Sequence, residues 1–470
     1  MHPDRRALLL VLVLAGAGWR GDGTARAPAA DPPLTLDPAA ATWSTPLPGW
    51  GNASPVRLGD LVCTTAEPTH VVCADAARGA VRWQATNDRL DTVPAAERPA
   101  MQARLAEGAD LGAKVRAGLS ELSRLQRETR RHPDDASLPA QVAAKSAEVD
   151  RLQAEQDALR SWLTPPELDL IGYASATPAT DGQRLYAMTG NGVVSAFAPD
   201  GRRLWARWLG EPVRPMKGFD YGSVTSPQLA DGVLVVGHRH LRGLDPATGA
   251  VRWEDAATWN HYGTPAVIDL GGLVLLALPD GRLLRARDGV QVAEGLGDIS
   301  YTGPVADGDR VWWVGGHGHR GDPSTNRATG WRLARSGDGV TPTRLFDTAL
   351  PKADRVYASP IVVGERLFVL TLDNTLSVLD AGTGATRGQV DLMPALTATG
   401  FAKPVGYANP TLAGSHLFLG WEEGLVAAVT VADTPAVAAV SVLGESARAT
   451  PWFEGRTVWG RTLTKLWRWR

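Results

Sequence analysis

The sequence lacks the features that mark nucleic-acid-binding and membrane-spanning proteins. Its 48 Lys and Arg residues nearly balance its 50 Asp and Glu residues, which leaves a formal net charge of −2. Without an excess of positive charge, no global field attracts nucleic acid or an anionic membrane surface. The apolar run at 7–17 is too short to span a bilayer. Nucleic acid is therefore excluded as a partner, and no transmembrane segment is expected in the mature chain.

Cysteine is nearly absent, because the chain contains only Cys63 and Cys73. Neither cysteine lies near the N-terminus, so a lipoprotein anchor is not indicated. The two lie on the arms of one expected hairpin, at 61–64 and 71–74. In an oxidising compartment such a pair favours a disulfide. Two buried thiols are the alternative, since a direct cross-strand bridge requires a specific Cβ spacing.

The first 27 residues are typical of a secretory signal peptide. Arg5 and Arg6 precede the apolar run, and a small-residue stretch ends in Ala25-Arg26-Ala27, near which we place the cleavage. A buried strand or a membrane anchor is the alternative for the apolar run. Residues 28–41 are expected to form a linker. The mature protein is thus expected to be soluble and periplasmic or secreted.

A repeat is the strongest signal in the chain. Each repeat begins with an anchor, in which a small or polar residue precedes Pro and a short run leads to Gly. The eight anchors are Ser54-Pro55, Thr177-Pro178, Ser226-Pro227, Thr264-Pro265, Gly303-Pro304, Ser359-Pro360, Asn409-Pro410 and Thr450-Pro451. An apolar run rich in β-branched and aromatic residues follows each anchor, as at 233–236, 311–314 and 367–370.

The repeat spacing predicts an all-β fold. Units of about 40 to 50 residues with four strands each are typical of a β-propeller. We therefore predict eight four-stranded antiparallel blades, with seven as the alternative. The last repeat, 450–470, has room for only three strands, so residues 41–50 are expected to add its outer strand. Residues 42–94 then form the first blade with this closing strand, and 164–470 form the remaining blades.

A turn at the end of several repeats carries a family resemblance. The runs Asp75–Gly79 to Trp83, Asp200-Gly201 to Trp205, Asp245–Gly249 to Trp253, and Asp380–Gly384 resemble the Asp-x-x-Thr-Gly-x-x-x-Trp turn of pyrroloquinoline-quinone-like (PQQ-like) propeller repeats. The exported chain is also similar to the periplasmic BamB-like members of that family. The resemblance implies that Trp83, Trp205 and Trp253 dock one blade on the next. The turns at Asp288, Asp338 and Asp380 lack this Trp.

Residues 95–163 interrupt the repeats. Apolar residues recur there at mostly three, four or seven positions in Ala-, Glu-, Arg- and Gln-rich sequence, which is typical of amphipathic helices. Residues 132–137 offer a turn and a cap between two such helices. The insert is therefore predicted to be an antiparallel helical hairpin of coiled-coil type. It serves either as a partner-binding arm on the channel face or as a solvated decoration or brace.

The resemblance also bears on catalysis. Enzymes of the family use adjacent cysteines in a strained disulfide, and carboxylate and amide ligands around Ca²⁺. Here the cysteines are ten residues apart, and no matching calcium ligands are found. The pairs His238 and His240, and His317 and His319, each lack an evident third metal ligand. We predict no cofactor, metal or enzymatic activity; a PQQ-dependent dehydrogenase with PQQ and calcium is the alternative.

Tyrosine is scarce, yet six of the seven residues precede an anchor Pro: Tyr173, Tyr221, Tyr262, Tyr301, Tyr357 and Tyr407. Charged or polar residues lie just upstream on the same face: Lys217, Asp220, His261, Asp298, Arg355 and Lys403. Aromatic rings with polar tips around a channel mouth suit a binding face. Packing of each Tyr between blades is the alternative. The chain is therefore expected to be a monomer that binds or scaffolds an envelope protein partner or a small ligand.

Overall fold

The computed structural model describes residues 18–159, 162, 171–211, 225–259, 262–316, 326–351 and 355–470. The chain divides into two compact units, 1–87 with 169–470, and 88–168. The units are described one at a time below. Among the described residues, no helix has both the length and the apolar character needed to cross a membrane.

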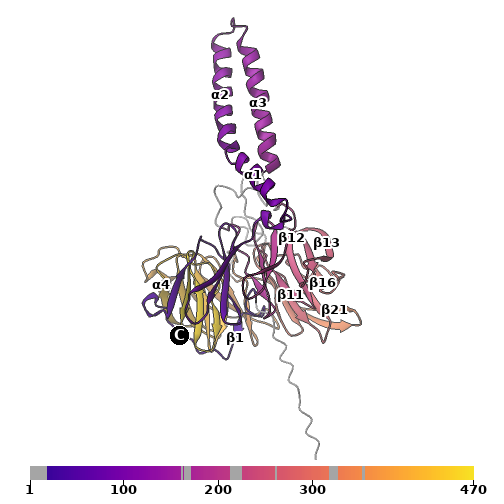
Figure 1. Cartoon of the computed structure of the whole chain (residues 1–470). Helices are drawn as coiled ribbons and strands as arrows, with labels where there is room; N and C mark the ends of the chain where they lie inside the picture. The colour runs from indigo at the N-terminus through magenta and orange to yellow at the C-terminus, as the bar shows by residue number, and fades with distance from the viewer. Residues whose placement is uncertain are drawn as a thin grey trace, which may run out of the picture. The chain divides into compact units, whose positions relative to one another are not determined.

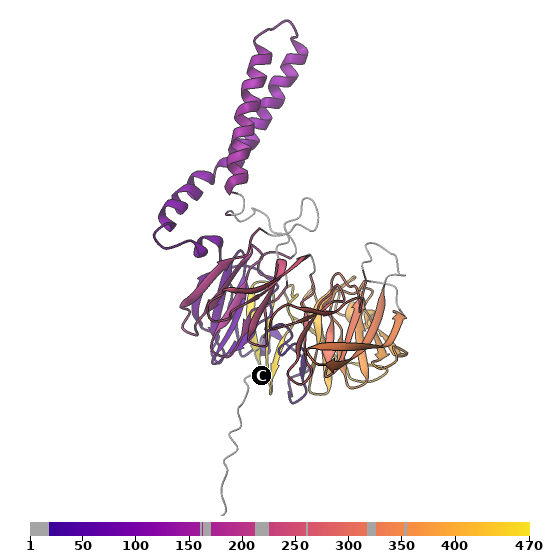
Figure 2. The ribbon, with the colours of Figure 1, turned by 90° about the vertical axis from the view of Figure 1, so that its right-hand side faces the viewer.

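The larger unit consists of eight antiparallel sheets, which lie side by side as the blades of a propeller (Figures 1 and 2). Neighbouring blades meet through their first strands, as β3 meets β7 and β18 meets β22. The first four blades comprise β3 (Val56–Leu58), β4 (Leu61–Ala66), β5 (His70–Asp75) and β6 (Val81–Thr86); β7 (Ala179–Thr180), β8 (Leu185–Met188), β9 (Val193–Phe197) and β10 (Arg203–Trp208); β11 (Gln228–Ala230), β12 (Val233–Leu244) and β13 (Val251–Trp259); and β14 (Ala266–Asp269), β15 (Val274–Ala277), β16 (Leu283–Arg285) and β17 (Gln291–Ala293).

The last four blades complete the eight that the repeat count predicted. They comprise β18 (Val305–Asp307), β19 (Arg310–Gly315), β20 (Arg327–Ser336) and β21 (Gly339–Ala349); β22 (Ile361–Val363), β23 (Arg366–Leu370), β24 (Thr375–Asp380) and β25 (Thr386–Asp391); β26 (Gly406–Ala413), β27 (His416–Trp421), β28 (Leu425–Thr430) and β29 (Val437–Val442); and β30 (Trp452–Glu454), β31 (Thr457–Arg461) and β32 (Lys465–Trp469), with β2 (Trp43–Pro46) as the outer strand. A short helix, α4 (Met393–Thr397), follows β25.

Two sheets do not have four strands. In the third blade, β12 pairs with β11 through its first half and with β13 through its second half, so it takes the place of both middle strands. In the seventh blade, the short strand β1 (Arg26–Ala27) adds to β26 in parallel, which gives five strands.

The apolar runs after the anchors form the core. Every residue of β4 and of β9 is buried, because these middle strands are covered by neighbouring blades on both faces. The buried clusters accordingly join two blades each. Trp312 of the fifth blade, for example, packs with Val362 and Leu367 of the sixth.

The last blade takes its outer strand from the N-terminal part of the chain, as predicted from a last repeat with room for only three strands. Strand β2 pairs antiparallel with β32, as Trp43 opposite Arg468 through Pro46 opposite Lys465. Thr450 N–H of the last blade donates to the Ser54 hydroxyl of the first at 3.0 Å. The ring is therefore closed without an open sheet edge at this junction.

The anchor residues explain the repeat by linking neighbouring blades. In each link the anchor N–H of one blade donates to the anchor side chain of the next, at 2.8 to 3.1 Å. The links are Ser54 to Thr177, Thr177 to Ser226, Ser226 to Thr264, Gly303 to Ser359, Ser359 to Asn409, Asn409 to Thr450, and Thr450 to Ser54. The remaining junction lies between Thr264 and Gly303, where glycine offers no side-chain acceptor.

The docking tryptophans lie where the family resemblance implies. Trp83, Trp205 and Trp253 donate their indole N–H groups to Pro199, Pro246 and Ala286 carbonyls of the next blade, at 3.0, 3.0 and 2.9 Å. Trp43 of the closing strand does the same to Ala76 at 3.3 Å. The glycine of each turn packs against the indole, as Gly249 does against Trp205, where a Cβ would lie 2.6 Å from the ring.

The smaller unit, 88–168, is helical. It contains η2 (Arg89–Thr92), α1 (Arg98–Gly108), α2 (Leu111–Arg131) and α3 (Leu138–Leu159), and α2 packs along α3. The first of the two expected helices, before the turn at 132–137, is divided at Ala109 into α1 and α2. Just before this break, Gly108 lies close to α3, where a Cβ would be 2.3 Å from Leu159 Cδ1. Glu121 and Glu128 flank Arg124 at 2.6 and 2.7 Å on the exposed face of α2.

The residues before the first blade are packed against the propeller. Leu36, within the segment expected to be a linker, is 1% exposed, and its N–H donates to Ser441 Oγ at 2.8 Å. A short helix, η1 (Pro38–Ala40), follows it and is capped by Asp37. Residues 18–27, expected to belong to the signal peptide, likewise contact several blades, as described below.

Candidate functional site: the tyrosine arc

Four tyrosines of the fourth to seventh blades form a continuous row, which we call the tyrosine arc: Tyr262, Tyr301, Tyr357 and Tyr407. Tyr262 and Tyr301 are stacked with ring centroids 5.8 Å apart. Tyr357 meets Tyr301 edge-on at 5.0 Å and stacks with Tyr407 at 5.3 Å. Each Tyr lies two residues before its anchor, and the repeat therefore brings the four rings together.

The contacts determine what the arc presents to a ligand. Because neighbouring rings cover one another's faces, the half-buried tyrosines offer mainly ring edges and hydroxyl groups. Ring edges carry partial positive charge, and a phenol O–H donates a hydrogen bond. Arg355 adds a cation, with its Nη1 donating to the Tyr357 hydroxyl at 2.8 Å and its guanidinium 5.8 Å from that ring. The arc is thus suited to acceptor-rich groups.

Two phenols of the arc, those of Tyr301 and Tyr407, are neutral at physiological pH. Burial and the nearby Glu422 carboxylate raise the pKa of Tyr407 to about 12, against the opposing effect of Arg448. Burial, with a smaller effect of Tyr357, also raises the pKa of Tyr301 above its ordinary value. Both groups therefore remain hydrogen-bond donors rather than phenolate anions.

A polar cluster beside the seventh blade continues the arc and was not found from the sequence. Arg448 forms an ion pair with Glu422, and its Nη1 lies 3.4 Å from Asn52 Oδ1 in the first blade. Glu422 directly follows β27, in the short connection to β28. Its N–H donates to the Val405 carbonyl at 2.8 Å, two residues before Tyr407, so the cluster and the arc are neighbours. No repeat signal marks these residues, because they lie outside the anchors and the turns.

The other predicted site residues are not all part of the arc. Tyr173 lies four residues before its anchor rather than two and is 6% exposed, with its carbonyl accepting from Gly190 N–H at 2.9 Å. Lys403 and Asp298 are exposed. Four predicted residues lie outside the described part of the chain: Lys217, Asp220, Tyr221 and His261.

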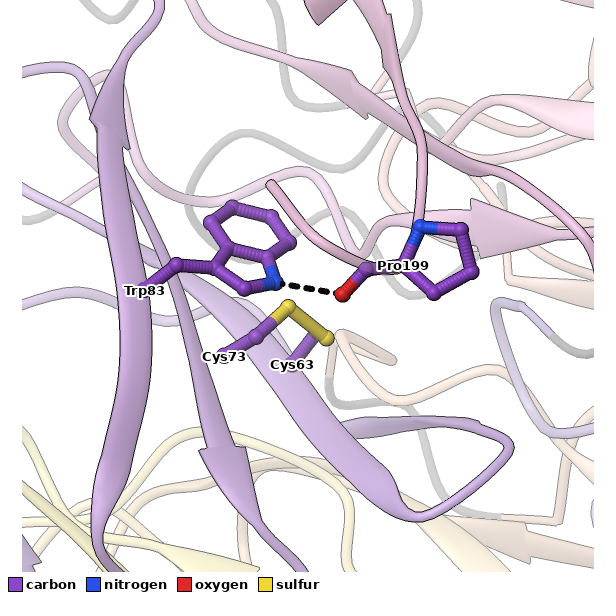
Figure 3. The surroundings of a disulfide bond; sticks show 4 residues. All are labelled: Cys63, Cys73, Trp83 and Pro199. Carbon is purple, nitrogen blue, oxygen red and sulfur yellow. Dashed lines mark hydrogen bonds between the residues drawn. A yellow bond between two sulfur atoms is a disulfide. The ribbon is translucent and has the colours of Figure 1, made fainter. Parts of the chain in front are cut away.

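The two cysteines are joined by a disulfide within the first blade (Figure 3). They are opposite each other on β4 and β5, with Cα atoms 4.1 Å apart, and both are 0% exposed. Trp83 lies beside the disulfide and belongs to the same apolar cluster (Figure 3). The bridge therefore belongs to the core between the first two blades rather than to the tyrosine arc.

The histidines considered as metal ligands are bound to backbone groups. His238 Nε2 is 2.9 Å from Gly210 O, and burial lowers the pKa of this histidine to about 4. His240 Nδ1 is 3.2 Å from Ala257 O. His317 and His319 lie outside the described residues. Within the described part of the chain, no three His, Cys, Asp or Glu side chains come together as a metal site would require.

Comparison with known proteins agrees with this architecture. The chain is a β-propeller whose repeats resemble those of the PQQ-like type. It resembles BamB: residues 167–324 match the family described as "Outer membrane protein assembly factor BamB". The crystal structure of BamB from Moraxella catarrhalis is 13% identical in sequence, with a TM-score of 0.54 over 92% of this chain and 97% of that one.

Other solved structures share the fold. The quinohemoprotein alcohol dehydrogenase ADHIIG from Pseudomonas putida HK5 is 10% identical, with a TM-score of 0.50 over 94% of this chain and 78% of that chain. The computationally designed Ika8 protein is 11% identical, with a TM-score of 0.52 over 90% of this chain and 98% of its own. A search of curated proteins finds no match. At these identities the likeness concerns the fold and does not assign a function.

Proposed function

We propose that this chain is a non-enzymatic binding propeller of the periplasm, which holds an extended segment of an envelope protein partner at the tyrosine arc. The arc itself is the observation that carries the proposal. Its four phenols, held in line by mutual ring contacts, supply a row of hydroxyl groups next to the Arg355 cation. Backbone carbonyls and carboxylates of a peptide are the acceptors that such a row would bind.

The resemblance to BamB favours a protein partner over a small ligand. An extended peptide can present acceptors at successive positions, whereas a small ligand engages only a few donors. The arc crosses four blades and leads to the Glu422–Arg448 pair, so its polar groups are spread over a surface rather than gathered in one enclosed pocket. A surface of this kind suits a chain of residues better than a single compact molecule.

A quinoprotein enzyme is the second candidate, since PQQ-dependent dehydrogenases share the fold. The described residues do not fit its cofactor site. The disulfide joins cysteines ten residues apart inside the first blade, and the described residues bring no three-carboxylate or mixed His and Asp cluster together. We therefore derive no catalytic step through a quinone or a metal ion.

Site-specific photo-cross-linking in intact cells tests the proposal. A benzophenone amino acid is placed at Tyr301 or Tyr357 of the arc, and at Tyr186 as the control. Tyr186 is 0% exposed, and its hydroxyl donates to Asp181 at 2.8 Å, so it offers the same chemistry away from the arc. We expect covalent adducts with one envelope protein from both arc positions and none from Tyr186. Adducts from Tyr186 alone, or none from either arc position, would contradict the proposal.

A further inference from the structure

Residues 18–27 lie in the middle of the propeller, where they contact five different blades. Arg20 Nη2 donates to Pro360 O of the sixth blade at 2.7 Å, and Arg26 pairs with Asp307 of the fifth at 2.8 Å. Strand β1 pairs with β26 of the seventh blade. A Cβ placed on Gly18 would lie 3.4 Å from Ala179 of the second blade, and one on Gly21 would lie 3.6 Å from Trp452 of the eighth. Since these partners belong to innermost strands or their anchors, the segment occupies the central channel.

The contacts of this segment are those of a folded part of the protein. Ala25 is 3% exposed and packs with Ile361 and Leu412. Its carbonyl accepts from Leu412 N–H at 2.9 Å, and the carbonyl of Ala27 accepts from Gly414 N–H at 3.1 Å. If Ala25 and Ala27 were absent, the N–H groups of Leu412 and Gly414 would lose the hydrogen-bond acceptors that buried backbone groups require.

The tip of the segment is a tight turn. Gly18 N–H donates to Gly21 O at 2.7 Å, and Gly21 N–H donates back to Gly18 O at 3.0 Å. Between them, the Arg20 side chain is 5% exposed, and its guanidinium lies 5.3 Å from the Trp19 ring. A cavity of about 210 Å³ remains beside the turn, lined also by Ser54, Pro55, Thr450 and Trp452.

The propeller is shaped to accept this tip. Gly303 takes the place that Ser, Thr or Asn occupies in the other seven anchors. A Cβ at Gly303 would lie 3.1 Å from Trp19 Cη2 and 2.3 Å from the Thr264 carbonyl oxygen. The one junction without an anchor hydrogen bond, between Thr264 and Gly303, is thus the place where Trp19 lies.

We propose that the signal peptide is removed between Ala17 and Gly18, and that the new N-terminus, residues 18–27, remains as a permanent plug of the central channel. Cleavage near Ala27 would discard every contact described above. Cleavage after Ala17 preserves them all.

The sequence offers the required processing site. Ala15-Gly16-Ala17 has the small-x-small pattern of signal peptidase substrates, and it forms the end of the apolar run at 7–17. Hydrolysis of the Ala17–Gly18 bond consumes one water and leaves a carboxylate on Ala17 and an ammonium on Gly18. That ammonium can still donate to the Gly21 carbonyl oxygen, since it keeps its N–H groups.

The mass of the exported protein tests the processing site. The full-length gene is expressed in a Gram-negative host, and the intact mass of the periplasmic product is measured. We expect the mass of residues 18–470 with one disulfide. The mass of 28–470, of the uncleaved chain, or of any other start would overturn the proposal.

Two matched substitutions sharpen this test. Ala17→Phe places a large side chain at the proposed cleavage position and is expected to leave the precursor uncut. Ala27→Phe makes the same change at the alternative position and is expected to leave the product beginning at Gly18. The reverse pattern would overturn the assignment, and because the readout is a mass, it does not depend on how well either variant folds.

Stability tests the plug separately. A chain that starts at Pro28 behind a foreign signal peptide is compared with one that starts at Gly18 behind the same signal peptide. The shorter chain is expected to melt at a clearly lower temperature, because it lacks β1 and the buried contacts of Ala25. Equal melting temperatures would show that residues 18–27 are not a structural plug.

Discussion

The two halves of the ring hold their blades together in different ways. In the eighth, first, second and third blades, a Trp on the outer strand docks on the turn of the next blade. These residues are Trp43, Trp83, Trp205 and Trp253, in that order. From the fourth to the seventh blade, contacts between the arc tyrosines link neighbouring blades. On the outer strand of the fifth blade, Phe346 replaces Trp against Gly384 and has no N–H to donate. Trp312, on a middle strand of that blade, supplies the indole N–H instead and donates to Ala381 O of the sixth blade at 2.9 Å.

This difference shows how packing and binding can coexist. Each docking Trp uses its only polar group on a backbone carbonyl of the next blade, so nothing remains for a ligand. A Tyr can use its ring for packing and keep its hydroxyl for a partner. The packing and binding interpretations of the tyrosines are therefore compatible, and they can be separated by removing the ring or only the hydroxyl.

The largest effect is expected in the Trp half. Trp253 is 8% exposed and packs against Gly289 of the next blade. Trp253→Ala should lower the free energy of unfolding by about 3 to 5 kcal/mol, the range found for deletion of large buried aromatic side chains. Urea unfolding followed by near-ultraviolet circular dichroism measures this loss.

Trp253→Phe is the matched control, because Phe346 occupies the corresponding place in the fifth blade. It keeps most of the ring and removes the hydrogen bond to Ala286, so a loss of about 1 kcal/mol is expected. If both variants unfold like the wild type, the tryptophans do not hold this half together.

A second effect concerns pH and the junction of the first, second and eighth blades. Burial raises the pKa of Glu67 to about 7, although hydrogen bonds from the backbone, including Ala174 N–H at 2.5 Å, and the nearby Arg461 oppose the shift. Because the folded-state pKa is above the unfolded value, stability from this group is full below about pH 4.5 and is lost as the pH rises through 7.

Glu67→Gln removes this dependence. Relative to the wild type, the variant should gain on the order of 2 to 3 kcal/mol of unfolding free energy between pH 5 and pH 8. Subtracting the two pH profiles cancels groups common to both proteins, such as His238, whose lowered pKa acts in the opposite direction. Parallel profiles would show that Glu67 titrates normally.

A smaller effect is expected in the Tyr half. Tyr301 has ring contacts with both Tyr262 and Tyr357, and Tyr301→Ala removes both. A loss of about 1 to 3 kcal/mol is expected, since each aromatic pair contributes about 0.5 to 1.5 kcal/mol. Tyr301→Phe keeps the rings and should remain within about 0.5 kcal/mol of the wild type in urea unfolding. Equal losses for Ala and Phe would mean that the hydroxyl, not the ring, is the packing element.

The propeller was predictable because its repeat signals have local physical causes. The anchor residues recur since each supplies a hydrogen bond to the next blade, as Thr450 does to Ser54. The Asp-x-x-Thr-Gly turn recurs because its glycine must accommodate an indole, as Gly249 does. Such requirements repeat with the blades and can be read without a structure.

The site was only partly predictable. The position of Tyr before the anchor identified the four arc residues, but it also selected Tyr173. Tyr173 lies four residues before its anchor, whereas each arc tyrosine lies two residues before its own, and it is buried. Glu422 and Arg448 were missed because their ion pair joins two loops that no repeat relates. The packing of residues 18–27 was missed as well, since contacts with five blades leave no local pattern.

The affinity of the partner identified by cross-linking tests the central claim most directly. The wild type is compared with the triple variant Tyr262→Phe, Tyr301→Phe and Tyr357→Phe, and both melting temperatures are recorded. We expect binding weaker by about 10- to 1,000-fold, from the loss of three hydroxyl groups at about 0.5 to 1.5 kcal/mol each, with a nearly unchanged melting temperature. A lower melting temperature with unchanged affinity per folded molecule would contradict the account and show that the arc only packs the blades.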